Sequence, residues 1–121
     1  MSVNKRQETS RNVKMPTEHA EQRAVVSWLR RRHIRFFAVP NGAQVSAKER
    51  AKLKAEGLEP GVPDLMFPGP RLALEMKARS SGATSDAQDD WLAYLAGEGW
   101  DCAVCHGAAE AIAWLKSRGL G

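Results

Sequence analysis

Residues 61–77 read Gly61-Val62-Pro63-Asp64-Leu65-Met66-Phe67-Pro68-Gly69-Pro70-Arg71-Leu72-Ala73-Leu74-Glu75-Met76-Lys77, a pattern typical of two short strands joined by a tight turn. Proline and glycine at 68 and 69 mark the reversal, because turns favour these residues. Side chains alternate between the two faces of a strand, so a four-residue loop over 68–71 fixes which residues face each other. The predicted pairs are Phe67 with Leu72, Leu65 with Leu74, and Asp64 with Glu75.

One face of this hairpin is apolar and suits a hydrophobic core. Its members are Leu65, Phe67, Leu72, Leu74 and Met76. The other face gathers Asp64, Glu75 and Lys77 at one end. Two carboxylates across a strand pair, with Cβ atoms about 5 Å apart, destabilise the sheet unless a positive charge lies between them. A divalent cation could supply that charge, because Mg²⁺ typically binds one or two carboxylates and keeps its other positions for water and phosphate.

Lys77 follows Glu75 on the same face, where an ammonium could orient a water or offset charge on a phosphate. The alternative interpretation is that these three side chains are ordinary surface residues without a chemical role. Carboxylates at strand ends are usually solvated, and Glu75 with Lys77 could form an exposed salt bridge worth less than about 1 kcal/mol. The three residues alone therefore leave both interpretations open.

Length and composition limit the class of protein. With 121 residues and 43% hydrophobic residues, we expect one domain with a real core. No apolar run approaches the roughly 18 residues of a membrane helix, and no signal-peptide pattern opens the sequence. We therefore expect a cytoplasmic protein that does not enter a membrane.

The basic charge is concentrated at the start of the chain. Four basic residues against one acidic residue give the first sixteen residues +3, out of +4 for the whole chain, whose pI is near 9.4. This segment has no apolar period, so we expect residues 1–16 to be a disordered basic arm and 17–119 to be the domain. Such an arm suits a phosphate polyanion, although basic tails are often only solubilising.

Thr17 is a candidate N-cap for a helix that runs to about Arg32. Glu18 and Gln22 share one face of it. A carboxylate in the first turn is favoured by the helix dipole alone, which is the simplest explanation of Glu18. The helix ends in a basic cluster that is either a solvated surface or a surface that binds a DNA backbone. Its members are Arg30, Arg31, Arg32 and Arg35.

The remaining segments alternate between strands and helices. Residues 34–39 predict a strand, closed by the turn Asn41-Gly42. Ser46 begins a short helix that ends near Glu56, and we expect this helix to lie on the surface as an insertion near the candidate site. Ser85 and Gln88 form a second capping box, which explains Gln88 structurally. We expect this helix to bury Trp91, Leu92, Tyr94 and Leu95. A strand over 100–105, parallel to the second hairpin strand, and a helix over 108–118 complete the chain.

Cys102 and Cys105, followed by His106, match a haem-attachment pattern and resemble redox and zinc sites. Haem attachment needs export, and a zinc site needs two further ligands, which no second cysteine pair supplies. Three residues apart in a strand, the two cysteines point to opposite faces. We therefore expect core residues and neither haem nor zinc.

Taken together, the chain resembles the VRR-NUC nuclease domains, a branch of the PD-(D/E)xK, restriction-endonuclease-like superfamily, in its stand-alone bacterial and phage form. The matching pieces are Glu18 with Gln22, Asn41-Gly42, Gly61-Val62-Pro63-Asp64-Leu65, Glu75-Met76-Lys77 and Ser85-Asp86-Ala87-Gln88. Each motif is weak alone, but five in this order are specific. The resemblance implies an α/β fold, with an αβββαβ core around a mixed four-stranded sheet flanked by helices.

The resemblance also implies roles for individual residues. Asp64 and Glu75, with the main-chain carbonyl of Met76, would ligate Mg²⁺ or Mn²⁺, and Glu18 would reach the same metal. Lys77 would position the attacking water and stabilise the transition state. Gln88 would lie just behind the site, with Gln22 and Asn41 as further supporting positions.

The implied function is metal-dependent endonucleolytic cleavage of DNA, at branched structures such as Holliday junctions, in repair, recombination or phage replication. A homodimer is expected, because two active sites are needed to nick both strands of a junction symmetrically. The alternative is a catalytically silent DNA-binding or scaffold module with the same fold. A sequence-specific restriction enzyme is disfavoured, because little chain is left for reading bases.

Overall fold

The computed structural model describes residues 16–40, 45–80 and 82–121, so the expected basic arm and Asn41 lie outside the described residues. The chain order is α2 (Glu18–Arg31), β1 (Phe37–Ala38), α3 (Ala47–Ala55), β2 (Leu65–Phe67), β3 (Leu72–Lys77), α4 (Asp86–Gly97), β4 (Asp101–His106) and α5 (Ala108–Ser117). This order confirms the predicted α/β fold. No helix in the described part of the chain is long and apolar enough to cross a membrane.

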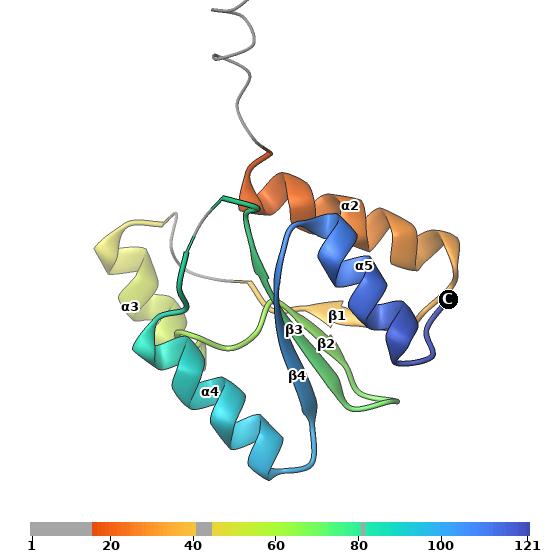
Figure 1. The fold of residues 1–121 in the computed structure, drawn as a ribbon. Helices are drawn as coiled ribbons and strands as arrows, with labels where there is room; N and C mark the ends of the chain where they lie inside the picture. The colour runs from red at the N-terminus through yellow and green to blue at the C-terminus, as the bar shows by residue number, and fades with distance from the viewer. Residues whose placement is uncertain (1–15, 41–44, 81) are drawn as a thin grey trace, which may run out of the picture.

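The four strands form one mixed sheet in the order β1-β2-β3-β4. β1 and β2, like β2 and β3, pair antiparallel, whereas β3 and β4 pair parallel. The hairpin has the predicted register, with Phe67 opposite Leu72 and Leu65 opposite Leu74. In Figure 1, α2 and α5 lie together over one side of the sheet and α4 lies on the other side. The α3 helix stands apart from the sheet.

Both faces of the sheet are buried. The larger core lies under α2 and α5 and contains the whole predicted apolar face of the hairpin, joined by Val25, Leu29 and Leu115. The smaller core lies under α4 and consists of Met66, Ala73 and Leu95. Cys105 belongs to the larger core, whereas Cys102 packs against the smaller one, which confirms that the two thiols point to opposite faces.

Two predictions about these elements were wrong in detail. The strand expected over 34–39 is only Phe37–Ala38, because its pairing with β2 extends over just Met66 and Leu65. Tyr94, expected in the buried stripe of α4, is 57% exposed and meets the ring of Trp91 edge-on. The core under α4 is small, so a narrow stripe centred on Leu95 is enough to fill it.

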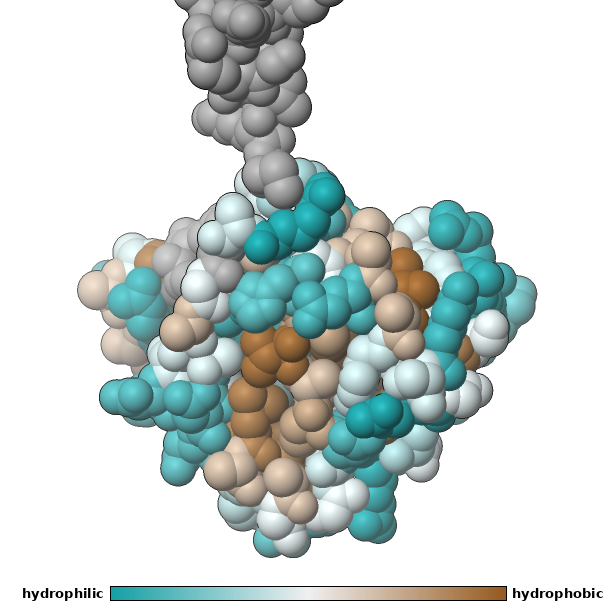
Figure 2. All heavy atoms as spheres, viewed as in Figure 1, coloured by the Kyte–Doolittle hydropathy of each residue, from teal (hydrophilic) through white to brown (hydrophobic). Residues whose placement is uncertain are grey.

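The face drawn in Figure 2 is mostly hydrophilic, with an apolar strip in its middle, where Figure 1 places β4 and the adjoining side of α4. Leu92 of α4 and Val104 of β4 are correspondingly only half-buried. Some apolar surface of these two elements therefore remains at the surface of the single chain.

Candidate active site

The predicted site residues come from four places that meet at one end of the sheet (Figure 1): the first turn of α2, the start of β2, the end of β3 and the first turn of α4. Glu18 is the first residue of α2, and Thr17 caps that helix with its side chain, as predicted. Asp64 directly precedes β2, Glu75 and Lys77 belong to β3, and Gln88 lies in the first turn of α4.

Asp64 and Glu75 form a buried pair of carboxyl groups, only 6% and 2% exposed. The backbone N–H of Met76 donates to Oδ2 of Asp64 at 2.7 Å, and Nε2 of Gln88 donates to Oε2 of Glu75 at 2.9 Å. Asp64 is the next position after the pair Leu65–Leu74 in the hairpin register, so the fold sets it opposite Glu75 as predicted. Both carboxyl groups are therefore held in place by the sheet and by α4.

Lys77 completes this group. Its Nζ lies 3.9 Å from Oε2 of Glu75 and donates a hydrogen bond of 2.9 Å to Oε1 of Gln88. The side chain is 13% exposed, so the ammonium is largely shielded from water yet next to two polar partners. A charge in such a setting acts more strongly on its neighbours than an exposed one.

Gln88 does more than the sequence indicated. Its capping box with Ser85 is present, with the Ser85 N–H donating to Oε1 of Gln88. The same amide also bridges Lys77 and Glu75. The capping pattern gave a complete local explanation of Gln88, so nothing in the sequence apart from the resemblance indicated this second role.

The carboxyl groups resist ionisation. Burial, followed by the charge of Asp64, raises the pKa of Glu75 to about 8. Burial also raises the pKa of Asp64, although the Met76 N–H and Lys77 oppose the shift. The pKa of Glu18 is raised by burial and then by Asp64, which shows that the third carboxylate lies within electrostatic reach of the pair. Asp64 and Glu75 therefore share a poorly hydrated place, and the half-buried Glu18 lies near enough to be influenced by the charge of Asp64.

A cavity of about 360 Å³ opens at this place. Glu18, Asp64, Glu75 and Gln88 line one part of it, and the loop 58–62 lines another. Its remaining wall includes two basic residues of α3, Arg50 and Lys54, which sequence analysis had not assigned to the site. The α3 helix was expected to be a surface insertion near the site, but no residue of it was given a role there.

The residues present suit a hard divalent cation. In the described part of the chain no three His, Cys, Asp or Glu side chains lie together as a ready set of metal ligands. The donors here are instead the Asp64–Glu75 pair and a main-chain carbonyl, and Mg²⁺ commonly uses so few protein ligands. Since the N–H and C=O of one residue in a strand point the same way, the carbonyl of Met76 faces the Asp64 side, as its N–H does.

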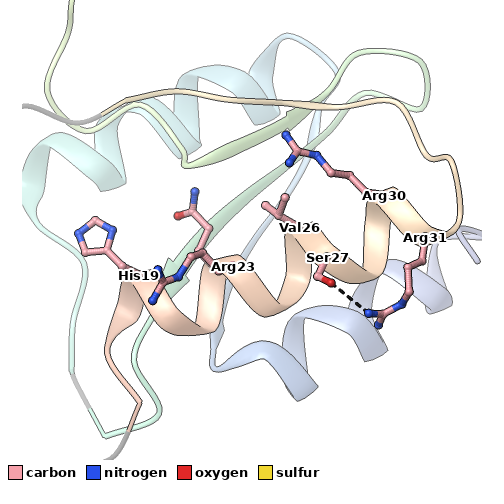
Figure 3. A pocket seen from close by; sticks show the side chains of 7 residues that line it. His19, Arg23, Val26, Ser27, Arg30 and Arg31 are labelled. Carbon is pink, nitrogen blue, oxygen red and sulfur yellow. Dashed lines mark hydrogen bonds between the residues drawn. The ribbon is translucent and has the colours of Figure 1, made fainter.

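Other predicted residues lie away from this cavity. Gln22 lines a broad cavity of about 820 Å³ on the exposed face of α2, together with Arg23, Arg30 and Arg31. Figure 3 shows these arginines along one side of the helix, with Arg31 donating to Oγ of Ser27 at 3.0 Å. Gln22 is thus not among the described residues that line the cavity beside Asp64 and Glu75.

The four arginines of the predicted basic cluster do not all have the same surroundings. The guanidinium of Arg32 lies over the ring of Trp28, 4.6 Å from its centroid, so this arginine covers an aromatic side chain. Arg35 lines two other cavities beside Phe36 and Phe37, one of which Arg30 also lines. Arg30 and Arg31 are the two members that share one exposed surface with further basic residues.

An ion pair that the sequence did not indicate ties α2 to the end of β3. Nε of Arg79 donates to Oε2 of Glu21 at 2.9 Å, and the Glu21 side chain is 7% exposed. Gly107 packs directly against both side chains, where a Cβ would lie 2.5 Å from Cγ of Arg79 and 2.8 Å from Oε2 of Glu21. The pair helps to hold the first turns of α2 next to Lys77.

An α/β fold that carries two carboxylates and a lysine at one end of a mixed sheet has the architecture of the restriction-endonuclease-like nucleases. The model of the VRR-NUC domain matches residues 3–109 of this chain. The chain therefore belongs to the VRR-NUC family of nuclease domains.

Among solved structures, the chain is similar to one described as a VRR_NUC domain protein, with a TM-score of 0.76 and 26% sequence identity. The similarity covers 90% of this chain and 93% of the other. No curated protein matches the chain. The family and the α/β architecture thus rest on both sequence and structure.

Proposed function

We propose that this protein is a metal-dependent endonuclease that hydrolyses DNA phosphodiester bonds. The observation that carries the proposal is the buried pair Asp64–Glu75, which lies beside Lys77 in a cavity of about 360 Å³. Family membership supports nuclease activity, and the carboxylate donors suit Mg²⁺ or Mn²⁺.

Each side chain has a defined task in this proposal. Asp64 and Glu75, with the carbonyl of Met76, hold the cation, and Glu18 adds negative charge from α2. The cation, when bound, supplies polarisation of the scissile phosphate and a more acidic water. Lys77 orients the attacking water and offsets the charge that develops on the phosphate. Gln88 fixes Lys77 and Glu75 relative to each other through its amide.

The exposed face of α2 supplies a surface for the DNA backbone. Glu18 marks its end at the active site, and Arg23, Arg30 and Arg31 follow along the helix (Figure 3). Twelve residues of α-helix separate Glu18 from Arg30, a distance of about 18 Å at 1.5 Å per residue. Phosphate contacts at such positions fix the orientation of DNA without reading its sequence.

Branched DNA is the proposed substrate, and a homodimer is the proposed assembly. Both follow from the resemblance to stand-alone nucleases of this family. A dimer with two-fold symmetry would present two equivalent sites to the two strands of a junction. Light scattering on the purified protein measures the assembly directly.

The test is cleavage of end-labelled four-way junction, flap and linear duplex DNA in Mg²⁺, Mn²⁺ or EDTA. We expect cutting that requires metal and is lost in Asp64→Asn and in Lys77→Ala, with both variants still folded. A folded Asp64→Asn protein that cuts at the wild-type rate would contradict the proposed site. Wild-type protein that binds DNA but cuts none of the three substrates with either metal would instead indicate the silent module.

A further inference from the structure

The α3 helix is built differently from the other helices. None of its side chains is buried, and four of its nine residues are basic against a single acidic one. A helix normally contributes to stability by burying an apolar face. Since α3 buries no side chain, its sequence is better explained by charge than by packing.

Two of the four basic residues, Arg50 and Lys54, face the active site. They lie four positions apart, and side chains at this spacing are neighbours on one side of a helix. Both line the cavity that also contains Asp64 and Glu75. Lys48 and Lys52 are not among the described residues that line it. The basic charge of α3 is therefore divided between a side that borders the cavity and a side that does not.

The contacts of the two residues are compatible with anion binding. The guanidinium of Arg50 donates to the carbonyl of Val45 at 3.3 Å, which helps to position the group at the cavity. Nζ of Lys54 lies 3.8 Å from a carboxylate oxygen of Glu59, with side chains 64% and 51% exposed. Exposed pairs of this kind contribute little, so a phosphate can replace Glu59 at low cost.

The cavity thus has an acidic wall, formed by Glu18, Asp64 and Glu75, and a basic wall, formed by Arg50 and Lys54. A cation held by the acidic wall would attract one phosphate, and the basic wall would attract others. A polynucleotide satisfies both walls at once, because its phosphates repeat along the strand, whereas a single phosphodiester fills only one of the two positions.

We propose that Arg50 and Lys54 bind the backbone phosphates next to the scissile one, so that α3 holds the polynucleotide strand across the active site. This inference rests on the proposed function, since it takes a nucleic acid as the substrate. It adds a binding role for a helix outside the motifs of the family. Phosphates are contacted without regard to base, so these residues contribute affinity and not sequence preference.

The experiment compares Arg50→Ala/Lys54→Ala with Lys48→Ala/Lys52→Ala, which removes the same charge from the other side of the same helix. Neither pair of side chains is buried, so both proteins should fold, and thermal melts check this. Binding of a labelled duplex is measured by fluorescence anisotropy from about 50 to 200 mM salt. Steady-state cleavage of the same duplex gives kcat and KM.

We expect the first variant to bind DNA about tenfold more weakly or worse, with a salt slope lower by about 2, since each lost phosphate contact removes about 0.9. The loss should fall mainly on KM. The second variant should change both quantities much less. Equal effects of the two variants would overturn the inference, because they would show that only the total charge of α3 matters. Binding is measured without cleavage, so an inactive wild type would contradict the proposed function and still leave this inference decided.

Discussion

The side-chain amide of Gln88 connects the first turn of α4 to Lys77 and Glu75. Its Oε1 accepts from the backbone of Ser85 and from Nζ of Lys77, and its Nε2 donates to Glu75. A residue of this kind positions others and need not touch the substrate. Its contribution can be separated from that of the helix cap, because Ser85 shares the cap, whereas the bonds to Lys77 and Glu75 are made by the side chain of Gln88.

Replacing Gln88 by Ala should therefore lower activity more than stability alone explains. We expect a loss of about 10–100-fold in cleavage rate or metal affinity, the usual effect of removing a residue that orients a metal ligand. The control Ser85→Ala breaks the same capping box and should cost about 1 kcal/mol of stability with little effect on the rate. Thermal unfolding and kcat are measured for both. Equal losses of activity in the two variants would assign the effect to the helix end.

At the scale of elements, the loop that leads into Asp64 depends on a close contact with α4. Gly61 has φ +90°, and a Cβ there would lie 2.5 Å from the carbonyl carbon of Ala87. Ala87 directly precedes Gln88, so this contact sets the distance between the Asp64 loop and the helix that carries the amide. Only glycine allows both the backbone angle and the contact.

Gly61→Ala should be more destabilising than Gly57→Ala, which serves as a matched control. Gly57 also has a positive φ, +108°, but a Cβ there would meet nothing within 4 Å. Both substitutions incur the backbone penalty, and only Gly61→Ala adds overpacking, which typically costs about 1–3 kcal/mol. Urea unfolding of the two variants measures the difference. If they are equally stable, Gly61 is needed for its backbone angle alone.

Elements specified by neighbouring residues could be predicted from the sequence. Thr17 and Ser85 cap their helices as expected, and the proline-glycine turn fixed the register of the hairpin. Features that depend on distant partners could not. The length of β1 depends on its pairing with β2, which extends over two residues, and the exposure of Tyr94 depends on the small core under α4. Local patterns carry no information about either partner.

At the scale of the molecule, the acidic part of the site was partly predictable, because two carboxylates and the lysine lie in one hairpin. The basic wall was not. Arg50 and Lys54 line the cavity because of where α3 packs, and the sequence of α3, with no buried side chain, does not indicate that position. Glu21 and Arg79 are 58 positions apart, so their ion pair was equally hidden from local patterns.

The buried carboxyl groups also make the stability of the whole metal-free protein depend on pH. The pKa of Glu75 is about 8 in the folded protein against 4.5 ordinarily, and that of Asp64 is raised as well. Between pH 5 and pH 8 the folded state therefore holds a proton that the unfolded chain has released. Stability depends on this difference in bound protons, so it should fall as pH rises across that window and level off above it.

A bound divalent cation should oppose this loss, because it stabilises the ionised carboxylates that the fold otherwise disfavours. We expect Tm in EDTA to fall from pH 5 to pH 8 by several degrees, since about 1 kcal/mol corresponds to roughly 4–8 °C in a domain near this size. The increase in Tm on adding Mn²⁺ should be larger at pH 8 than at pH 5. Glu75→Gln keeps the shape of the side chain and cannot ionise, so its Tm should depend less on pH and respond less to Mn²⁺. A wild type whose Tm in EDTA is flat over this window, or a Glu75→Gln protein with the same slope, would show that Glu75 is ionised in the folded protein without a cation.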